Sequence, residues 1–233
     1  MAVMTSPTPG PHPPVLHRIR HVAAPSMVVL VLHGGRVRST EPAQTGHLSA
    51  ARMRPFARAI ARRMPDATVL MLQYRFRGWN GADRSPVADA RWALDRIRDR
   101  YGDVPVVLVG HSMGGRTAAA VADDPSVDTI VALAPWWPEG TEADTLRPGQ
   151  HLQVLHGRLD RWTSPRLSLL ATQRAAERGV DARWLSMGMA GHFMLMRPWV
   201  WTRRVVAAVG AAAARIADAH PIDDHPIRQE NLR

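Results

Sequence analysis

The hydrophobic residues of the chain form short continuous runs that alternate with longer stretches of mixed polarity. The runs are rich in aliphatic and β-branched residues and show little alternation, which predicts strands buried on both faces, as at the centre of a parallel sheet. They cover residues 27–32, 68–72, 104–109, 129–133 and 152–155. Residues 183–187 are a less apolar candidate, which we expect near an edge of the sheet.

Apolar residues between these runs recur at spacings of three and four, which is typical of amphipathic helices. The predicted helices cover residues 48–64, 84–100, 113–122, 165–178 and 194–217. Regular alternation of strands and helices predicts an α/β fold, with a doubly wound, mostly parallel sheet and helices on both faces. In such a fold the ligand site lies at the carboxyl ends of the strands.

The two ends of the chain differ in composition from this alternating region. Residues 1–14 are rich in proline, which disfavours helices and sheets, and residues 218–233 are polar and interrupted by proline. We therefore expect a flexible arm, a single domain over 15–217 and a loose tail. The arm lacks the apolar segment of a secretory signal, and the longest apolar run, 27–32, is far shorter than the roughly 20 residues of a membrane span. A cytoplasmic location is the expectation.

Composition excludes several kinds of chemistry. The sequence has no cysteine, and all 30 basic residues are arginine. A thiol nucleophile, a cysteine-ligated metal, a Schiff-base lysine and a Walker A phosphate loop are therefore excluded. The net charge is +10, but the arginines are scattered along the chain, so we expect a solvated arginine-rich surface and no nucleic-acid partner. No metal-binding spacing such as HExxH is present, and no cofactor is expected.

The clearest chemical motif is GHSMGG at residues 110–115, which joins a buried run to a predicted helix. Small residues on both sides of a serine allow a sharp, strained turn, which lifts the hydroxyl group of Ser112 above the edge of the sheet. The N-terminus of the following helix then faces developing negative charge. The motif predicts that Ser112 is a nucleophile; the structural alternative is a tight turn with an inert serine.

A serine nucleophile needs a base, and the base needs a carboxylate that orients it. His192 lies in the glycine-containing loop after the last candidate strand and is the expected base. Asp160 directly follows a buried run and is the expected acid, with Glu139 and Glu142 as alternatives from the preceding loop. The order Ser112, Asp160, His192 leaves room for a strand–helix unit in each interval.

The sequence LHGGR follows the first buried run and supplies candidate oxyanion donors. Glycine lets backbone N–H groups approach an oxyanion closely. We expect the amides of Gly35 and Met113 to form the oxyanion hole, with Gly34 or Arg36 as alternatives to Gly35. His33, in the same sequence, is expected to be structural.

Residues from about 27 to 217 resemble the α/β-hydrolase superfamily, because HGG, GHSMGG and HGRLD followed by GH occur in that superfamily's order. The resemblance implies a Ser112 nucleophile, an Asp160 acid, a His192 base and oxyanion amides at Gly35 and Met113. It is nearest to small bacterial esterases and to the dienelactone-hydrolase-like group, although the dienelactone hydrolases themselves use cysteine. Epoxide hydrolases and haloalkane dehalogenases carry aspartate at this turn, so serine argues against those activities.

The loops at the carboxyl ends of the predicted strands bear on the substrate. The interval 135–150 is too short for a cap of several helices, which predicts an open site or one shielded by a single loop. Four tryptophans follow strand ends and are expected to wall a shallow apolar substrate pocket, unless they seal the rim of the core. They are Trp79, Trp136, Trp137 and Trp162.

Arg75 and Arg77, after the second run, either hold an acidic substrate group or are solvated. The sequence as a whole predicts a serine hydrolase that cleaves carboxylic esters of small or medium acyl substrates through an acyl-enzyme intermediate. Thioester or amide cleavage, or acyl transfer by the same residues, and a catalytically silent binding protein are the alternatives. The expected partner is a small-molecule ester or acyl substrate, and the oligomeric state stays open.

Overall fold

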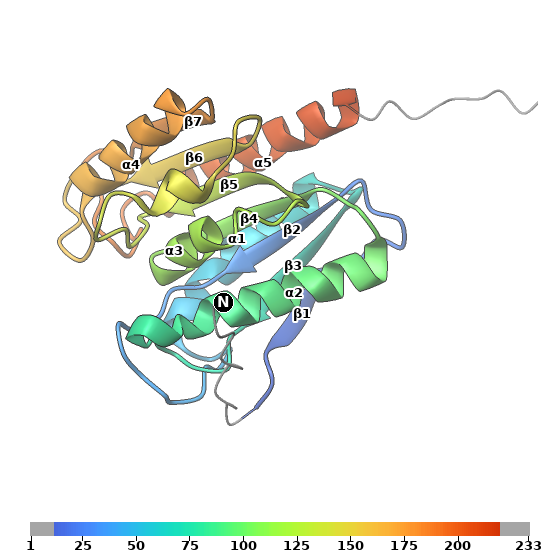
Figure 1. Cartoon of the computed structure of the whole chain (residues 1–233), viewed down its shortest axis with the longest axis horizontal. Coiled ribbons are helices and arrows are strands. Elements are labelled where there is room, and N and C mark those ends of the chain that lie inside the picture. The colour runs from blue at the N-terminus through green and yellow to red at the C-terminus, as the bar shows by residue number, and fades with distance from the viewer. Residues whose placement is uncertain (1–11, 220–233) are drawn as a thin grey trace, which may run out of the picture.

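A twisted seven-stranded sheet forms the centre of the computed structural model, which describes residues 12–219 (Figure 1). Its order is β1-β3-β2-β4-β5-β6-β7, with β1 antiparallel to β3 and the other pairs parallel. The strands are β1 (Val15–Arg20), β2 (Met27–Leu32), β3 (Ala67–Gln73), β4 (Val106–His111), β5 (Val127–Leu133), β6 (His151–His156) and β7 (Asp181–Ser186). The predicted doubly wound, mostly parallel sheet is confirmed.

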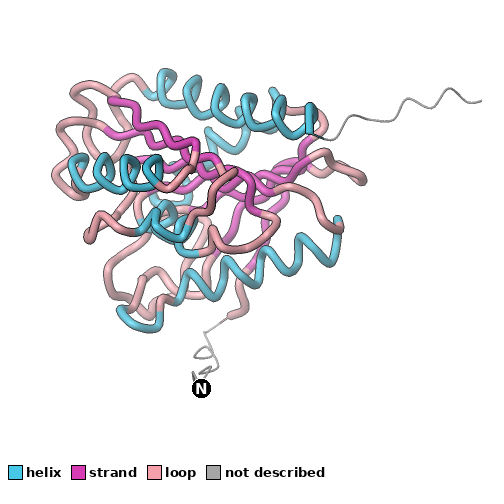
Figure 2. The backbone as a smooth tube through the Cα atoms, turned by 45° about the horizontal axis from the view of Figure 1, so that its top comes forward, coloured by secondary structure: helices cyan, strands magenta, loops and turns pink. Residues whose placement is uncertain are grey.

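Helices cover both faces of this sheet, as Figure 2 shows. The α-helices are α1 (Leu48–Arg63), α2 (Ser85–Tyr101), α3 (Met113–Ala120), α4 (Pro165–Glu177) and α5 (Pro198–Ala219), and η1 (Gly81–Asp83) and η2 (Glu142–Thr145) are short 3-10 helices. Buried residues of α1 and α5 pack on one face, and those of α2, α3 and α4 pack on the other.

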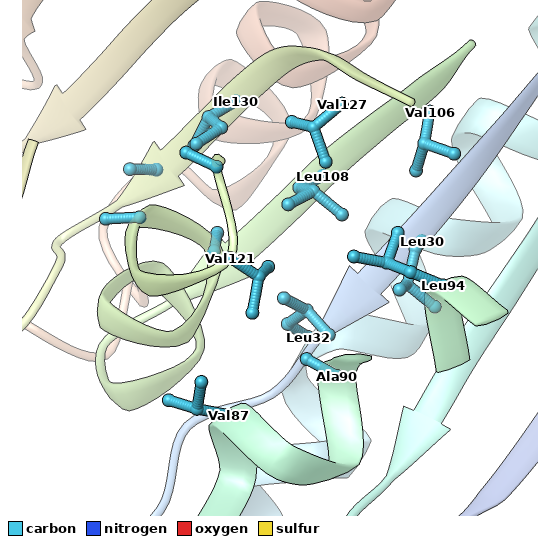
Figure 3. Close-up of a cluster of buried hydrophobic side chains, with 14 of the residues drawn as sticks. Leu30, Leu32, Val87, Ala90, Leu94, Val106, Leu108, Val121, Val127 and Ile130 are labelled. Atoms are coloured by element: carbon cyan, nitrogen blue, oxygen red, sulfur yellow. The ribbon is translucent and has the colours of Figure 1, made fainter. Parts of the chain in front are cut away.

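Strand β2 shows why the central runs are continuously apolar. All of its residues are buried. Val29 and Val31 belong to the layer under α1 and α5, whereas Leu30 and Leu32 face the opposite layer. Figure 3 shows Leu30 and Leu32 on the same side of the sheet as side chains of α2, β4 and β5. Alternate residues therefore enter two different cores, and neither face can carry polar side chains without burying them.

The largest differences between the structure and the sequence prediction concern β1 and α5. Strand β1 was not predicted, because its residues are exposed or only partly buried and it pairs through one edge alone. The predicted helix over 194–217 begins at Pro198, since proline lacks an N–H and favours the first turn of a helix. Met194 and Arg197 before it have positive φ angles of 58° and 50°.

The terminal predictions fall mostly outside the described residues. Of the arm over 1–14, the structure describes only the last three residues, and of the tail over 218–233 only the first two, which continue α5. Within the described range, no helix combines the length and the apolarity that crossing a membrane requires.

The direction of chain winding reverses between β2 and β4, which are neighbours in the sheet although β3 follows β2 in the chain. A crevice at the carboxyl ends of the strands is expected at such a switch point. The loop after β2 carries Gly34 and Gly35, and the turn after β4 carries Ser112. Over residues 135–150, the only helical element is η2, so no helical cap arises from this loop.

Candidate active site

Ser112 occupies a strained turn between β4 and α3, with φ 55° and ψ −117°. Residues other than glycine rarely adopt a positive φ, and this kind of backbone strain is concentrated at functional sites. A Cβ atom at Gly110 would collide with the carbonyl group of Gly114, and one at Gly114 would collide with the carbonyl group of Leu32. Glycine at these two positions thus lets α3 pass close to β2 and β4.

The side chains of Ser112, His192 and Asp160 form a continuous hydrogen-bonded chain. The Oγ atom of Ser112 lies 3.0 Å from Nε2 of His192, and Nδ1 of His192 lies 2.8 Å from Oδ2 of Asp160. Ser112 is partly accessible, whereas His192 and Asp160 are buried. The structure therefore brings together the three residues on which the sequence analysis settled.

Asp160 is a fully satisfied acceptor. Its Oδ1 accepts hydrogen bonds from the amides of Trp162 and Thr163 at 2.8 and 2.9 Å. Its Oδ2 also accepts from the Thr163 hydroxyl at 2.8 Å and lies 3.1 Å from Nε2 of His156. Burial by itself would raise the pKa of Asp160, but hydrogen bonds from His156, His192 and Thr163 outweigh it and hold the pKa well below its usual range. The carboxylate is therefore charged at neutral pH.

Glu139 and Glu142, the alternative acids, are engaged elsewhere. Their carboxylates lie 3.1 and 3.8 Å from the guanidinium group of Arg116. Both line a separate hollow next to Trp79 rather than the pocket around Ser112. Neither forms a hydrogen bond with His192 among those of the described residues.

The two candidate oxyanion amides have no acceptor within residues 12–219. Neither the N–H of Gly35 nor that of Met113 forms a hydrogen bond there. The amide of Arg36, by contrast, donates to the carbonyl oxygen of Arg77 at 2.8 Å, which removes Arg36 from the alternatives. Gly34 stays an alternative to Gly35.

A cavity of about 340 Å³ opens beside the Ser112 hydroxyl. Trp136 and Trp162 line it. Trp162 is 73% exposed, and its ring stacks with the His192 ring, with 6.4 Å between the ring centres. The other walls come from residues 34–37, from Ser49 and Arg52 of α1, and from Phe193. The contribution of α1 was not predicted, because Ser49 and Arg52 belong to no recognisable sequence motif.

Trp79 and Trp137 do not line this cavity, contrary to the prediction. Trp137 is buried in the core, where its Nε1 donates to the Gly115 carbonyl oxygen at 3.3 Å. Trp79 is buried behind Trp136, with the Arg116 guanidinium group 4.4 Å from its ring centre. The two adjacent tryptophans at 136 and 137 thus have different environments, one at the pocket and one in the core.

Arg75 and Arg77 are both engaged within the protein. Arg75 pairs with the buried carboxylate of Asp89, and Arg77 pairs with Glu41. Neither lines the cavity beside Ser112. The suggestion that they hold an acidic substrate group is therefore not supported by their positions.

His156 and Thr163 complete the surroundings of Asp160 and were not singled out in the sequence. His156 is fully buried, and its Nδ1 lies 2.7 Å from the Ser168 hydroxyl oxygen. The Thr163 hydroxyl donates to Asp160, and its oxygen also lies 3.3 Å from Nδ1 of His192. Only their spacing in the sequence could have indicated this role, because His156 precedes Asp160 by four residues and Thr163 follows it by three.

Two further histidines lie buried close to the site. His33 follows β2 and contacts the ring of Tyr74. The Nε2 atom of His111 lies 3.0 Å from the backbone oxygen of His192. Burial lowers the pKa of His33 to about 4 and that of His111 to about 3. Both imidazoles are therefore neutral in the folded protein at pH 7.

These two histidines predict a loss of stability at mildly acidic pH. Below pH 6.5 the unfolded chain protonates both imidazoles, whereas the folded chain protonates them only near pH 4 and pH 3. The free energy of unfolding should therefore fall as the pH is lowered from 7 to 5. Urea denaturation at both pH values should show a smaller fall for His33→Gln than for the wild type. Equal falls would contradict the assignment to His33.

The fold and the geometry together define a class: a doubly wound α/β protein with a serine, a histidine and an aspartate linked at its switch point. The chain belongs to the α/β-hydrolase fold family, whose model matches residues 28–155. None of the curated proteins matches the sequence significantly.

Solved structures share this fold at low sequence identity. An acetyl ester-xyloside bifunctional hydrolase from Caldicellulosiruptor lactoaceticus is 15% identical, with a TM-score of 0.65 over 90% of this chain and 92% of that chain. A thermophilic esterase from Thermogutta terrifontis is 15% identical, with a TM-score of 0.64 over 87% and 89%. A serine hydrolase without a lid from Xanthomonas campestris is 18% identical, with a TM-score of 0.57 over 88% of each chain. At these identities the likeness concerns the fold.

Proposed function

We propose that this protein is a serine hydrolase that cleaves carboxylic esters through an acyl-enzyme intermediate. The observation that carries the proposal is the hydrogen-bonded chain from Ser112 through His192 to Asp160, in a turn whose backbone is strained at the serine. This arrangement supplies a nucleophile, a base within reach of its proton and a carboxylate that orients the base.

In the first half of the reaction, Nε2 of His192 takes the proton of the Ser112 hydroxyl as Oγ bonds to the ester carbonyl carbon. The carbonyl π-electrons move to oxygen, and the amides of Met113 and Gly35 donate hydrogen bonds to that oxyanion. When the tetrahedral intermediate collapses, the bond to the alcohol oxygen breaks. The alcohol leaves with the proton held by His192, and the acyl group stays on Ser112.

In the second half, a water molecule gives a proton to His192 and its oxygen attacks the acyl carbon. Collapse of this second intermediate breaks the bond to Ser112, whose Oγ recovers the proton from His192. The products are a carboxylic acid and the free enzyme. Asp160 keeps its charge throughout and stabilises the imidazolium form of His192.

The pocket supports esters of small or medium size as substrates. Its volume is about 340 Å³, its walls include the rings of Trp136, Trp162 and Phe193, and the loop over residues 135–150 adds no helical cap above it. The proteins with a similar fold include an esterase and a serine hydrolase without a lid, which agrees with this proposal.

A fluorophosphonate probe combined with a substrate series tests the proposal. Folded protein should be labelled on Ser112 and should hydrolyse p-nitrophenyl esters, with the rate falling as the acyl chain outgrows the pocket. Matched thioesters and amides in the same series should react more slowly than the esters. Folded protein that neither labels at Ser112 nor turns over any ester would overturn the proposal in favour of a silent binding protein.

A further inference from the structure

The pocket beside Ser112 contains a cationic side chain that pairs with no carboxylate of the described residues. Arg52 lies on α1, lines the pocket and is partly buried. Its guanidinium carbon lies 4.7 Å from the centre of the Phe193 ring, and it takes part in none of the ion pairs of residues 12–219. A charge held in this way loses hydration without gaining an opposite charge.

Three other arginines near the site are arranged differently, and Arg36, which has no carboxylate partner among the described residues either, is exposed. Arg75, Arg77 and Arg116 each pair with a carboxylate of the protein. Burial lowers the pKa of Arg52 with no acidic neighbour to offset it, yet a guanidinium group stays protonated at neutral pH. Arg52 therefore presents a half-desolvated positive charge inside the pocket.

The rest of the pocket favours an anion as well. Its described lining contains no aspartate or glutamate, and the exposed Arg36 adds a second positive charge at its rim. Ser49 lies three residues before Arg52, on the same face of α1, and also lines the pocket. Within the described residues its hydroxyl forms no hydrogen bond, so the pocket contains a second side chain that can donate to an anion.

We propose that this pocket selects esters that carry a carboxylate group, and that Arg52 binds that carboxylate. The inference rests on the proposed esterase function and names its substrate class. A carboxylate presents two oxygens in the plane that a guanidinium fork matches, and its single charge balances that of the partly buried Arg52. The Ser49 hydroxyl, in the lining of the same pocket, is a further donor for that group.

Two matched pairs of esters test the selection, because the carboxylate can lie on either side of the scissile bond. Monomethyl adipate and methyl adipamate differ by a carboxylate on the acyl side, and 4-acetoxybenzoate and 4-acetoxybenzamide differ by one on the leaving group. Acid release at constant pH gives kcat/KM for each ester. The wild type should prefer the anionic member of at least one pair, and the preference should weaken as salt is added.

Variants on α1 assign the preference to one residue. Arg52→Gln should lower the ratio of anionic to neutral kcat/KM about tenfold or more, because it removes a charge-assisted hydrogen bond. Arg52→Lys should restore part of that ratio, since it returns the charge without the fork. Arg58→Gln, an exposed position farther along the same helix, should keep the wild-type ratio.

The outcomes separate this inference from the proposed function. Ester turnover with equal rates for both members of both pairs would overturn the inference alone. A preference that Arg52→Gln leaves unchanged would overturn the assignment to Arg52. If Arg52→Gln does not fold, inhibition of the wild-type enzyme tests the selection instead: adipate monoamide, which has a carboxylate, should inhibit, and adipamide, which has none, should not. Absence of all ester turnover and of Ser112 labelling would overturn the esterase proposal and this inference with it.

Discussion

Replacing Ser112 by alanine should lower kcat for p-nitrophenyl butyrate on the order of 10⁴-fold or more. The variant keeps the Cβ atom and the backbone of the turn but loses the oxygen that would bond to the acyl carbon. His192 would then have no hydroxyl proton to accept, and only binding and the oxyanion amides would remain. Burst and steady-state kinetics on the released nitrophenolate measure the loss.

Ser186→Ala is a matched control for that variant. Ser186 is an exposed residue at the end of β7, and it does not line the pocket. Its replacement should leave kcat within about twofold, as expected of a surface substitution. Both variants should show the circular dichroism spectrum of the wild type. Near-normal turnover by folded Ser112→Ala would refute the nucleophile.

Asp160→Asn should lower kcat about 10³- to 10⁴-fold with little change in the fold. The neutral amide cannot stabilise the imidazolium form of His192. If its NH₂ group faces Nδ1 of His192, the ring carries its proton on Nε2 and cannot accept one from Ser112. Steady-state kinetics on the same ester measure the effect. Turnover at the wild-type level would show that the reaction needs no acid at this position.

The same variant has a pH signature in stability. The pKa of Asp160 is lower in the folded chain than in the unfolded chain. Its contribution to the free energy of unfolding is therefore fully present above about pH 4 and is lost as the pH falls through the pKa of the folded state. Asp160→Asn should therefore destabilise the protein at pH 7, and the difference from the wild type should shrink towards pH 3. Urea denaturation at both pH values measures it, with the exposed Asp103→Asn as the control.

The two proposals place different demands on the same pocket. Hydrolysis requires the chain from Ser112 to Asp160, which is built from the ends of β4 and β6 and the loop after β7. Selection of a carboxylate requires α1, which approaches from another part of the sequence. Substrate preference can therefore change through Arg52 while the reacting groups stay in place.

Most of the sheet and the position of the catalytic candidates followed from the sequence. Buried parallel strands need apolar residues on both faces, so the runs around β2 and β4 are recognisable without any partner. The turn at Ser112 needs glycine at 110 because β4 and α3 approach each other closely there, and at 114 because α3 also passes close to β2. Strand β1 was not predicted, because an edge strand buries few of its side chains and its sequence contains no continuous apolar run.

The tertiary structure alone decided which side chains share the pocket. Trp136 and Trp137 are neighbours in sequence, but one lines the pocket and the other fills the core, and no local pattern distinguishes them. His156 shares Asp160 with His192, and Arg52 reaches the pocket from α1 without belonging to any motif. Sequence spacing encodes turns and burial because they depend on neighbouring residues. The composition of a cavity depends on how distant elements pack, which only the folded chain determines.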